Sequence, residues 1–328
     1  MSEDSPMYEQ MIQLQMSMFQ KTREEILGEK EGIMGANVVE LKADMLTAKT
    51  EPIRIVPGQF QATGTCFEGH AFYEASSIRK IKDTYYFIYS CEQNNQLCYA
   101  TSKYPDKDFQ YRGVIISNAD LEYHGRKAVD AVNLCGTNHG SIEYINGRWY
   151  VFYQRLTHGT DYSRQACAEE IMILPDGTIP QVEVTTQGLN GGPLAPEGEF
   201  DASIACNITN GKMPNIQFQP VKVATDVPCV THDGDEHFIT RITDGTTIGY
   251  KYFDFKGEYR LSIVTRGCGK LIVRDNEREL GAFDITENKK WNTSTISFEV
   301  MGVKPLFFRF VGEGSIDFRS FSFCQSEK

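Results

Sequence analysis

The sequence has no long apolar run, no paired-cysteine motif and no excess of basic residues. Nowhere do about 18 apolar residues follow one another, and residues 1–20 lack both a basic start and an uninterrupted apolar stretch, so neither a membrane span nor an export signal is predicted. The nine cysteines are an odd number without a C-x-x-C pair, which disfavours a disulfide framework or a zinc site. We therefore expect a cytoplasmic protein with reduced thiols and no membrane partner.

The chain is acidic. Its 33 Lys and Arg stand against 44 Asp and Glu, and the net charge of -11 argues against nucleic acid as a partner, because that affinity depends on clustered cations. With 41% hydrophobic and 23% charged residues, the composition is that of an ordinary globular protein. A length of 328 residues leaves room for two domains.

The first 34 residues differ in pattern from the rest of the chain. Apolar side chains at spacings of three and four predict one amphipathic helix from Met7 to Gly28. A Met-rich stripe is more often a packing face than a functional groove, so we assign it no chemistry. The stripe consists of Met7, Met11, Leu14 and Met18.

From residue 35 onward, short β-rich runs alternate with turns, which predicts an all-β region. Two segments look alike, SSIRKIKDTYYFIYS at 76–90 and GSIEYINGRWYVFYQ at 140–154. Each predicts a strand, a tight turn at Asp83 or at Asn146-Gly147, and an aromatic-rich strand. A repeated hairpin of this kind is typical of successive β-propeller blades.

A Gly- and Pro-rich stretch at 187–198 predicts a linker to a second domain. Beyond it, short runs that alternate apolar and polar residues predict a β-sandwich of the jelly-roll type, with separate strands at 249–255, 259–265 and 270–273 among them. We therefore expect three parts: a helical segment at 1–34, a partial β-propeller at 35–198 and a β-sandwich at 199–328.

Glu74 is the candidate residue with the clearest chemistry. It stands in FYEASSIRK, next to aromatic residues and at the start of a strand that leads into a tight hairpin. Partly apolar surroundings raise the pKa of a carboxyl group, which a general acid near neutral pH requires. On pattern alone, a solvated surface glutamate is the more common alternative.

The segment around Glu74 carries a family resemblance. GHAFYEASSIRKIKDTYYFIYS at 69–90 resembles the third-blade signature of glycoside hydrolase family 43, the β-xylosidases, α-L-arabinofuranosidases and arabinanases. In that family a Glu followed by a small residue, then Pro or Ser, a strand and a Tyr-Tyr hairpin carries the general acid. The resemblance implies that Glu74 is the proton donor of a hydrolase with a five-bladed β-propeller.

Two further segments extend the resemblance. NHGSIEYINGRWYVFYQR at 138–155 is similar to the fourth-blade motif, whose His coordinates a calcium ion or its waters, so His139 is the candidate metal ligand and sugar contact. YSRQACAE at 162–169 is similar to the fifth-blade entry, whose Arg reaches the sugar in the first subsite, and Arg164 is the candidate for that role. The alternatives are a loop-closing histidine and a surface ion pair.

The C-terminal region carries a second resemblance. The run IGYKYFDFKGEYRLSIVTRGCGKLIVRD at 248–275 resembles the family 6 carbohydrate-binding modules that often follow such hydrolases. These modules bind by stacking aromatic faces on sugar rings, and Tyr250, Tyr252 and Trp291 are the candidates. For each of them a place in the core is the alternative.

The N-terminal part departs from the family pattern. GANVVELKADMLTAKTEPIRIVPG at 35–58 resembles the end of the second blade, so the resemblance implies that the first blade and most of the second are missing, together with the Asp that serves as base. The family inverts, and inversion requires a second carboxyl group. Asp4, ahead of the helix, and Asp44, in an expected surface turn, are not credible bases. We expect an incomplete propeller with impaired catalysis.

Three hypotheses follow. The first is a glycoside hydrolase that cleaves xylan- or arabinan-derived oligosaccharides, with Glu74 as acid. The second is a non-catalytic protein whose sandwich binds oligo- or polysaccharides. The third is an interaction fragment that self-associates through the N-terminal helix or through the open propeller edge, where strand groups are left unpaired.

Overall fold

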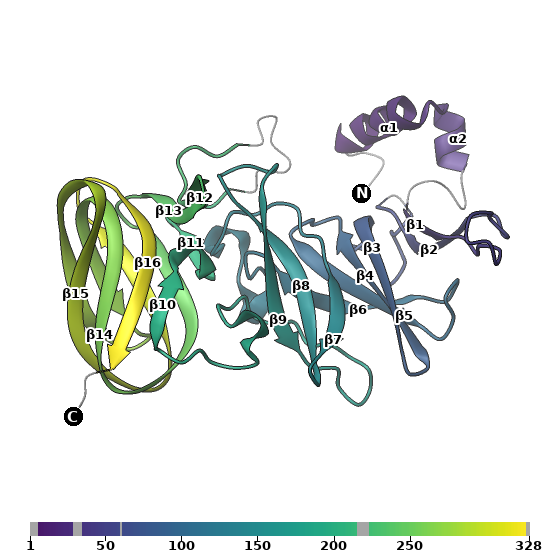
Figure 1. Ribbon diagram of the computed structural model, residues 1–328. Helices are drawn as coiled ribbons and strands as arrows, with labels where there is room; N and C mark the ends of the chain where they lie inside the picture. Colours follow the sequence, from purple (N-terminus) through teal and green to yellow (C-terminus); the bar gives the residue numbers. More distant parts are fainter. Residues whose placement is uncertain (1–5, 29–34, 60, 215–222, 326–328) are drawn as a thin grey trace. The chain divides into compact units, whose positions relative to one another are not determined.

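The computed structural model describes residues 6–28, 35–59, 61–214 and 223–325, and it confirms the expected all-β fold, with α-helices near the N-terminus (Figure 1). By their internal contacts the residues form two compact units. The first comprises 1–114 and 139–141, and the second comprises 115–138 and 142–328. No helix within the described ranges is both long and apolar enough to cross a membrane.

Two helices, α1 (Pro6–Phe19) and α2 (Arg23–Gly28), replace the single helix that the spacing predicted. The chain breaks at Gln20, whose φ of 52° is left-handed. Thr22 then begins α2 with a capping box: its Oγ1 accepts from Glu25 N at 3.2 Å, and Glu25 Oε2 accepts from Thr22 N at 2.7 Å. The prediction of one helix was wrong because this T-x-x-E signal outweighs the continuous apolar spacing.

Of the predicted stripe, Leu14 is the residue whose side chain the structure describes, and it does not belong to the packing face of the helices. Tyr8, Ile12 and Ile26 form a small buried cluster, whereas Leu14 is 51% exposed. The side chains of Met7, Met11 and Met18 lie outside the described residues. The face that α1 buries is therefore the one that contacts α2, which a single helix would not have.

Two antiparallel sheets form most of the first unit. β1 (Gly35–Val38) pairs with β2 (Ile53–Pro57). A second sheet follows in simple up-and-down order, and its members are β3 (Phe72–Ile81), β4 (Thr84–Cys91), β5 (Gln96–Ser102) and β6 (Gln110–Ser117). The central strands β4 and β5 are buried on both faces, while the outer strand β3 is only partly buried. The turn predicted at Asp83 is confirmed, since Ile81 pairs with Thr84.

A similar hairpin recurs in the second unit. The strands are β7 (Ser141–Ile145), β8 (Arg148–Leu156) and β9 (Arg164–Ile171), and they form a three-stranded sheet in chain order. The predicted turn at Asn146-Gly147 has φ values of 50° and 86°, the left-handed pair that a two-residue hairpin favours. Short 3₁₀ helices lie in the loops at Tyr123–Gly125, Ala128–Asp130, Gly188–Asn190 and Ala202–Ile204.

The C-terminal sandwich also belongs to the second unit. Its seven strands are β10 (Gly198–Asp201), β11 (Asn207–Thr209), β12 (Cys229–Asp233), β13 (Glu236–Ile242), β14 (Thr247–Arg274), β15 (Glu279–Val311) and β16 (Ile316–Gln325). The first part of β14 pairs with the second part of β15, and the last part of β14 pairs with both ends of β15. The two long strands therefore curl over one another into a double layer, as a jelly roll requires.

The expected strands at 249–255, 259–265 and 270–273 are in fact one continuous strand, β14. Glycines bend it without a loop: Gly267 and Gly269 have φ of 109° and 143°. A Cβ on Gly267 would lie 2.1 Å from Ser315 O, and one on Gly269 would lie 2.1 Å from the Phe310 ring. The glycines between the expected strands at 259–265 and 270–273 therefore mark close approaches inside a bent strand.

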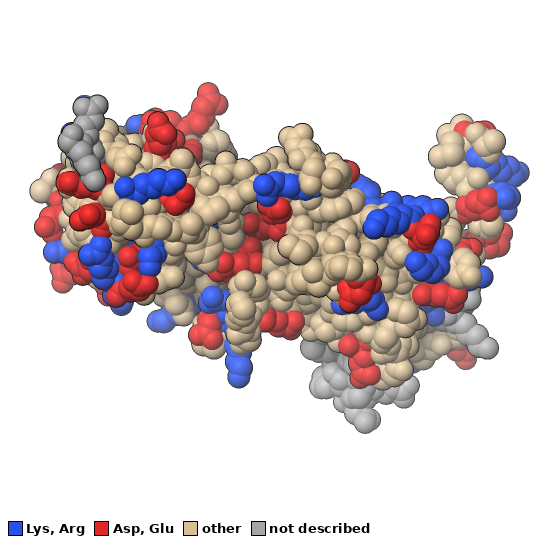
Figure 2. Space-filling view, turned by 90° about the horizontal axis from the view of Figure 1, so that it is seen from below, with Lys and Arg blue, Asp and Glu red and all other residues tan. Residues whose placement is uncertain are grey.

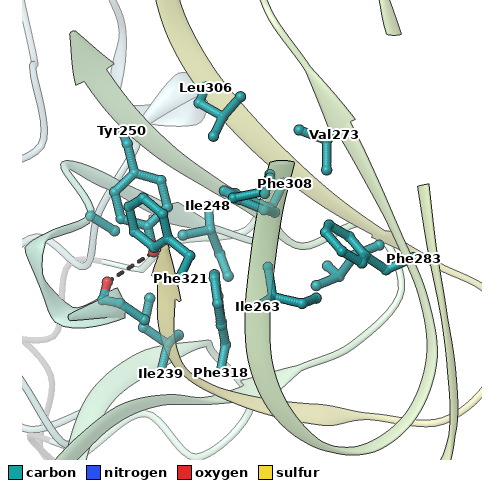
Figure 3. Close-up of a cluster of buried hydrophobic side chains, with 14 of the residues drawn as sticks. Ile239, Ile248, Tyr250, Ile263, Val273, Phe283, Leu306, Phe308, Phe318 and Phe321 are labelled. Atoms are coloured by element: carbon teal, nitrogen blue, oxygen red, sulfur yellow. Dashed lines mark hydrogen bonds between the residues drawn. The ribbon is translucent and has the colours of Figure 1, made fainter. Parts of the chain in front are cut away.

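Aromatic side chains fill the sandwich. Figure 3 shows Tyr250 beside Phe321 and Phe308, with ring centroids 4.5 and 5.7 Å away. All three are buried, and truncating such a side chain typically costs about 3–5 kcal/mol. The sandwich thus has a core of its own, drawn from residues between 202 and 323.

Charged side chains of both signs are scattered over the face shown in Figure 2. On the face in Figure 2, the described Lys and Arg side chains stand among Asp and Glu. Charges mixed at this spacing weaken each other's field at a distance.

Candidate active site

Glu74 lies in an irregular part of β3. Phe72 pairs with Cys91, Glu74 with Ser90 and Ser77 with Ile88, so the register shifts on both sides of Glu74. Ala75 takes a left-handed φ of 62°. Such bulges re-aim a side chain and are frequent beside active sites. The short A-S-S stretch after Glu74 tolerates this geometry because none of its side chains is bulky.

His139 meets Glu74 within the first unit. Its Nε2 atom lies 2.8 Å from Glu74 Oε1, and the two side chains are 40% and 37% exposed. The nitrogen itself is covered, and it is not aligned with the carboxylate as in a hydrogen bond. The contact is therefore electrostatic, and its strength depends on the protonation of the imidazole. Two of the three residues predicted at the catalytic centre are thus brought together, with the carboxyl group open to a ligand.

A pair of hydroxyl groups holds the strands that carry them. Ser77 Oγ lies 2.7 Å from Ser141 Oγ, which links β3 to the first residue of β7. Arg79 Nη1 donates to Ser77 Oγ at 3.4 Å. Because Ser77 follows Glu74 by three residues and Ser141 follows His139 by two, this link fixes the backbone on both sides of the carboxylate–imidazole contact.

Arg164 begins β9 in the second unit, and it is exposed. Its Nε and Nη2 atoms donate to Thr137 Oγ1 at 3.2 and 2.9 Å. Thr137 is buried and also bonds to Asp161 Oδ1 at 3.4 Å, so the hydroxyl is a fixed anchor. An anchored guanidinium presents planar donors in a constant direction, as a sugar contact requires.

Asp44 does not serve as a base. Its oxygens accept from Leu46 N at 2.9 Å and from Thr47 N and Oγ1 at 3.0 and 2.7 Å, which close an exposed turn. The hydrogen bond from Leu46 N, followed by those from Thr47, lowers the pKa of this carboxyl group. Asp4 lies outside the described residues. The sequence-based expectation of a surface turn at Asp44 therefore agrees with its contacts.

The surroundings of His139 offer too few ligands for a calcium ion. Ca²⁺ takes six to eight oxygen ligands, whereas the site offers one carboxylate and one imidazole nitrogen. In the described parts of the chain, His, Cys, Asp and Glu form no group of three or more that could hold a metal ion. These residues do not fit calcium, and calcium at His139 remains a prediction from the resemblance.

Tyr250 was wrongly predicted to stack on a sugar. Its exposed fraction is 0%, and its hydroxyl donates to Ala202 O at 3.0 Å within the core (Figure 3). Neither face of the ring reaches the surface. The alternation of β14 places this residue on the inner face, which the aromatic composition of the run concealed.

Trp291 is partly exposed, and two arginine side chains lie over its ring. Arg266 and Arg319 lie over the ring, with guanidinium carbons 4.5 and 5.4 Å from the centroid. The ring packs edge-on against Phe238, and its Nε1 donates to Glu236 at 3.0 Å. Its role as a sugar platform remains a prediction.

Tyr252 is the predicted aromatic residue that lines a cavity. Its hydroxyl donates to Glu183 Oε2 at 2.8 Å. The cavity has a volume of about 210 Å³ and is also lined by Glu169, Glu183 and a loop with Gly191 and Gly192. Carboxylates and an aromatic ring around a hollow of this size are suited to a small polyol.

Glu169, on β9, was not predicted from the sequence. It is 4% exposed and accepts from Tyr153 OH at 3.0 Å and from Thr185 N at 2.7 Å. Burial raises the pKa of Glu169 to about 7, against the opposing effect of its hydrogen bonds with Thr185 and Tyr153. A lone glutamate in a strand gives no signal in sequence, because its burial depends on the loop that carries Thr185.

Lys251 occupies a buried position next to this cavity. Its Nζ atom lies 2.7 Å from Glu183 Oε1 and 3.6 Å from Asp120 Oδ2, and its side chain is 6% exposed. Burial raises the pKa of Asp120, and the positive charge of Lys251 opposes that effect. Through these ion pairs, Lys251 on β14 contacts Asp120 in the loop after β6 and Glu183 in the loop after β9.

The comparisons with known proteins agree with the motifs. The chain is 44% identical over 308 residues to a xylosidase/arabinosidase of Thermoclostridium stercorarium, a match that covers 88% of this chain and 64% of that protein. It is 30% identical over 162 residues to a xylosidase/arabinosidase of Bacteroides ovatus, covering 48% of this chain and 45% of the relative. The resemblance to these glycoside hydrolases is thereby confirmed, and the chain spans less than two thirds of either relative.

Solved structures were also compared. A glycoside hydrolase family 43 arabinoxylan arabinofuranohydrolase from Bacillus subtilis, in complex with cellotetraose, matches with 20% identity and a TM-score of 0.42 over 88% of this chain and 59% of that one. No family model matches the sequence.

Proposed function

We propose that this chain carries the acid site of a glycoside hydrolase acting on xylan- or arabinan-derived oligosaccharides. The observation that supports the proposal most is the 2.8 Å contact between Glu74 and His139 on a bulged, partly exposed strand. The 44% identity to a xylosidase/arabinosidase supports the substrate class. An oligosaccharide is therefore the proposed partner.

Glu74 is the proton donor in this proposal. Its Oε1 faces His139, so Oε2 is the oxygen that approaches the glycosidic oxygen of the substrate. As the bond between that oxygen and the anomeric carbon breaks, the proton of Glu74 passes to the leaving group. The family resemblance assigns a sugar contact to Arg164, whose guanidinium donates to Thr137 Oγ1.

Attack by water requires a second carboxylate about 6.5–9.5 Å from the first in an inverting enzyme. Asp44 is committed to its turn and cannot take this role. We therefore expect slow turnover of ordinary glycosides by this chain, and faster turnover when a small anionic nucleophile such as azide replaces activated water.

The test is hydrolysis of aryl β-xylosides and aryl α-L-arabinofuranosides with and without azide. The proposal predicts turnover that azide accelerates, and loss of turnover of poorly activated glycosides in Glu74→Gln. Glu143→Gln, an exposed carboxylate at the edge of the next sheet, is the control and keeps the wild-type rate. A chain that is folded by circular dichroism but inert on all these substrates, with and without azide, contradicts the proposal.

A second candidate function is sugar binding without catalysis, at a cavity to which the sandwich contributes Tyr252. The cavity lined by Tyr252, Glu183 and Glu169 favours it, because these groups offer a ring face and acceptors for hydroxyl groups. Calorimetry with xylo- and arabino-oligosaccharides tests it. Binding that survives Glu74→Gln and is lost in Tyr252→Ala supports this site, whereas binding that Tyr252→Ala leaves unchanged excludes it.

Self-association remains a prediction. Among the helix side chains that the structure describes, Leu14 and Leu27 are 51% and 49% exposed and offer apolar contact area. Light scattering over a range of protein concentrations tests it, and a constant monomer mass contradicts it.

A further inference from the structure

Three of the six histidines gather in the second unit. His158 lies in the loop after β8, His232 on β12 and His237 on β13. His158 Nε2 and His232 Nδ1 are 2.9 Å apart. His232 and His237 are direct partners in the β12–β13 ladder, with ring centroids 6.1 Å apart.

The backbone holds the first two rings in place. His158 N donates to Val230 O at 2.7 Å, which fixes the loop against β12 two residues before His232. Arg241 Nη2 donates to His158 O at 3.3 Å from the other side. The approach of the two imidazoles is therefore set by main-chain contacts and does not depend on the rings alone.

Hydroxyl groups orient the ring of His158. Its Nδ1 atom lies 3.0 Å from Ser163 Oγ and 3.1 Å from Thr157 Oγ1. If Nδ1–H donates to one of these hydroxyls, Nε2 carries the lone pair that faces His232. A metal-binding histidine has this arrangement, because a partner on the second nitrogen fixes its tautomer and its orientation.

The distance between the two nitrogens suits a metal ion. Two nitrogen ligands at about 2.1 Å from an ion and at right angles to each other are about 3 Å apart. The observed separation is 2.9 Å, with the rings 79° from parallel. An ion would displace the proton that the nitrogens now share, and the exposed ring of His232 would turn so that both lone pairs converge on it.

We propose that His158 and His232 chelate a divalent first-row transition-metal ion of the Ni²⁺ type, and that His237 rotates in as a third ligand. Right-angled imidazole ligands are typical of Ni²⁺ and Cu²⁺ more than of tetrahedral Zn²⁺. Water completes the coordination, because the described residues hold no preformed group of three metal ligands. The positive charge of Arg241 opposes binding, while Asp233 and Asp235 in the β12–β13 turn favour it.

Calorimetry with NiCl₂ on the untagged, metal-free chain tests the site. We expect one Ni²⁺ per chain, at least tenfold weaker binding in His232→Ala, and unchanged binding in His124→Ala. His124 is the matched control, because it is exposed and its ring contacts Tyr123. Equal affinities of the wild type and His232→Ala, or no heat at all, would overturn the proposal.

Two further measurements separate the site from general unfolding. Ser163→Ala leaves both imidazoles in place but removes an orienting hydroxyl, and we expect a loss in Ni²⁺ affinity of about tenfold or more. Saturating Ni²⁺ should raise the melting temperature of the wild type and not that of His232→Ala, since an ion bound only by the folded chain stabilises it. A Ni²⁺-dependent rise that is equal in both proteins would contradict the site.

Discussion

His139 Nε2 lies 2.8 Å from Glu74 Oε1, although Glu74 is on β3 and His139 lies in the loop before β7. The bulge of β3 brings Glu74 to this position, and His139 stands two residues before the start of β7. The hydroxyl pair Ser77–Ser141 holds the two segments together. The carboxyl group proposed as the acid thus depends on a contact between segments that are distant in sequence.

The Ser77–Ser141 link should be measurable as a coupling in stability. A hydrogen bond between two side chains contributes about 0.5–1.5 kcal/mol, so we expect the Ser77→Ala and Ser141→Ala double-mutant cycle to give a coupling in that range. Urea denaturation of the four proteins measures it. Additive effects of the two substitutions would show that the hydroxyl groups do not interact.

Glu169 should make stability depend on pH. Burial raises its pKa from 4.5 to about 7, so the folded chain holds a proton that the unfolded chain releases between these values. The stability that this proton contributes is fully present below about pH 4.5 and is lost as the pH rises through about 7. The total loss in the free energy of unfolding is up to about 3 kcal/mol.

Glu169→Gln isolates this effect. Its carbonyl oxygen can accept from Tyr153 OH and Thr185 N, and its amide can donate to Thr185 Oγ1, without a titrating proton. We expect the variant to lose less stability than the wild type between pH 5 and pH 8. If the melting temperatures of the two proteins change with pH by the same amount over this range, the pKa of Glu169 is not raised.

Lys251→Ala should strongly destabilise the second unit. It would leave Asp120 and Glu183 without their buried cation, and breaking a buried pair in this way typically costs about 3–5 kcal/mol. The control is Lys256→Ala on the same strand, whose pair with Asp254 is exposed and worth less than about 1 kcal/mol. Chemical denaturation compares the two, and similar losses would contradict the account of a buried charge cluster.

Gly269→Ala should cost more stability than Gly257→Ala. Both glycines are in β14 with φ of 143°, so the backbone strain is matched. The added methyl group at 269 would meet the Phe310 ring at 2.1 Å, whereas at 257 the nearest atom is Gln325 Nε2 at 4.0 Å. Overpacking of this kind costs about 1–3 kcal/mol, so we expect the free energies of unfolding of the two variants to differ by that amount. Equal losses of stability in the two variants would contradict the prediction.

Local signals in the sequence predicted the fold class and the hairpins. The turns at Asp83 and Asn146-Gly147 were correct because their geometry depends on a few neighbouring residues. The break at Thr22 was missed although its capping box is visible in T-x-x-E. The continuity of β14 was not predictable, because Gly267 and Gly269 bend a strand or end it depending on what packs against them.

The candidate site was predictable only where a motif marks it. Glu74 and His139 were found through their segments, and the structure places them in contact. Tyr250 was misassigned because an aromatic residue in an alternating strand faces inward or outward according to register. Glu169 and the His158–His232 contact have no local pattern, since their partners lie in distant parts of the chain.

The central claim, that Glu74 gives its proton to the leaving group, is tested most directly by two glycosides that differ only in the leaving group. With a poor leaving group such as a 4-methylphenoxide, Glu74→Gln should lower kcat/KM by about 10²–10⁴-fold. With 2,4-dinitrophenoxide, which departs without a proton, the variant should stay close to the wild type. An equal loss on both substrates would contradict the role of Glu74 as the acid.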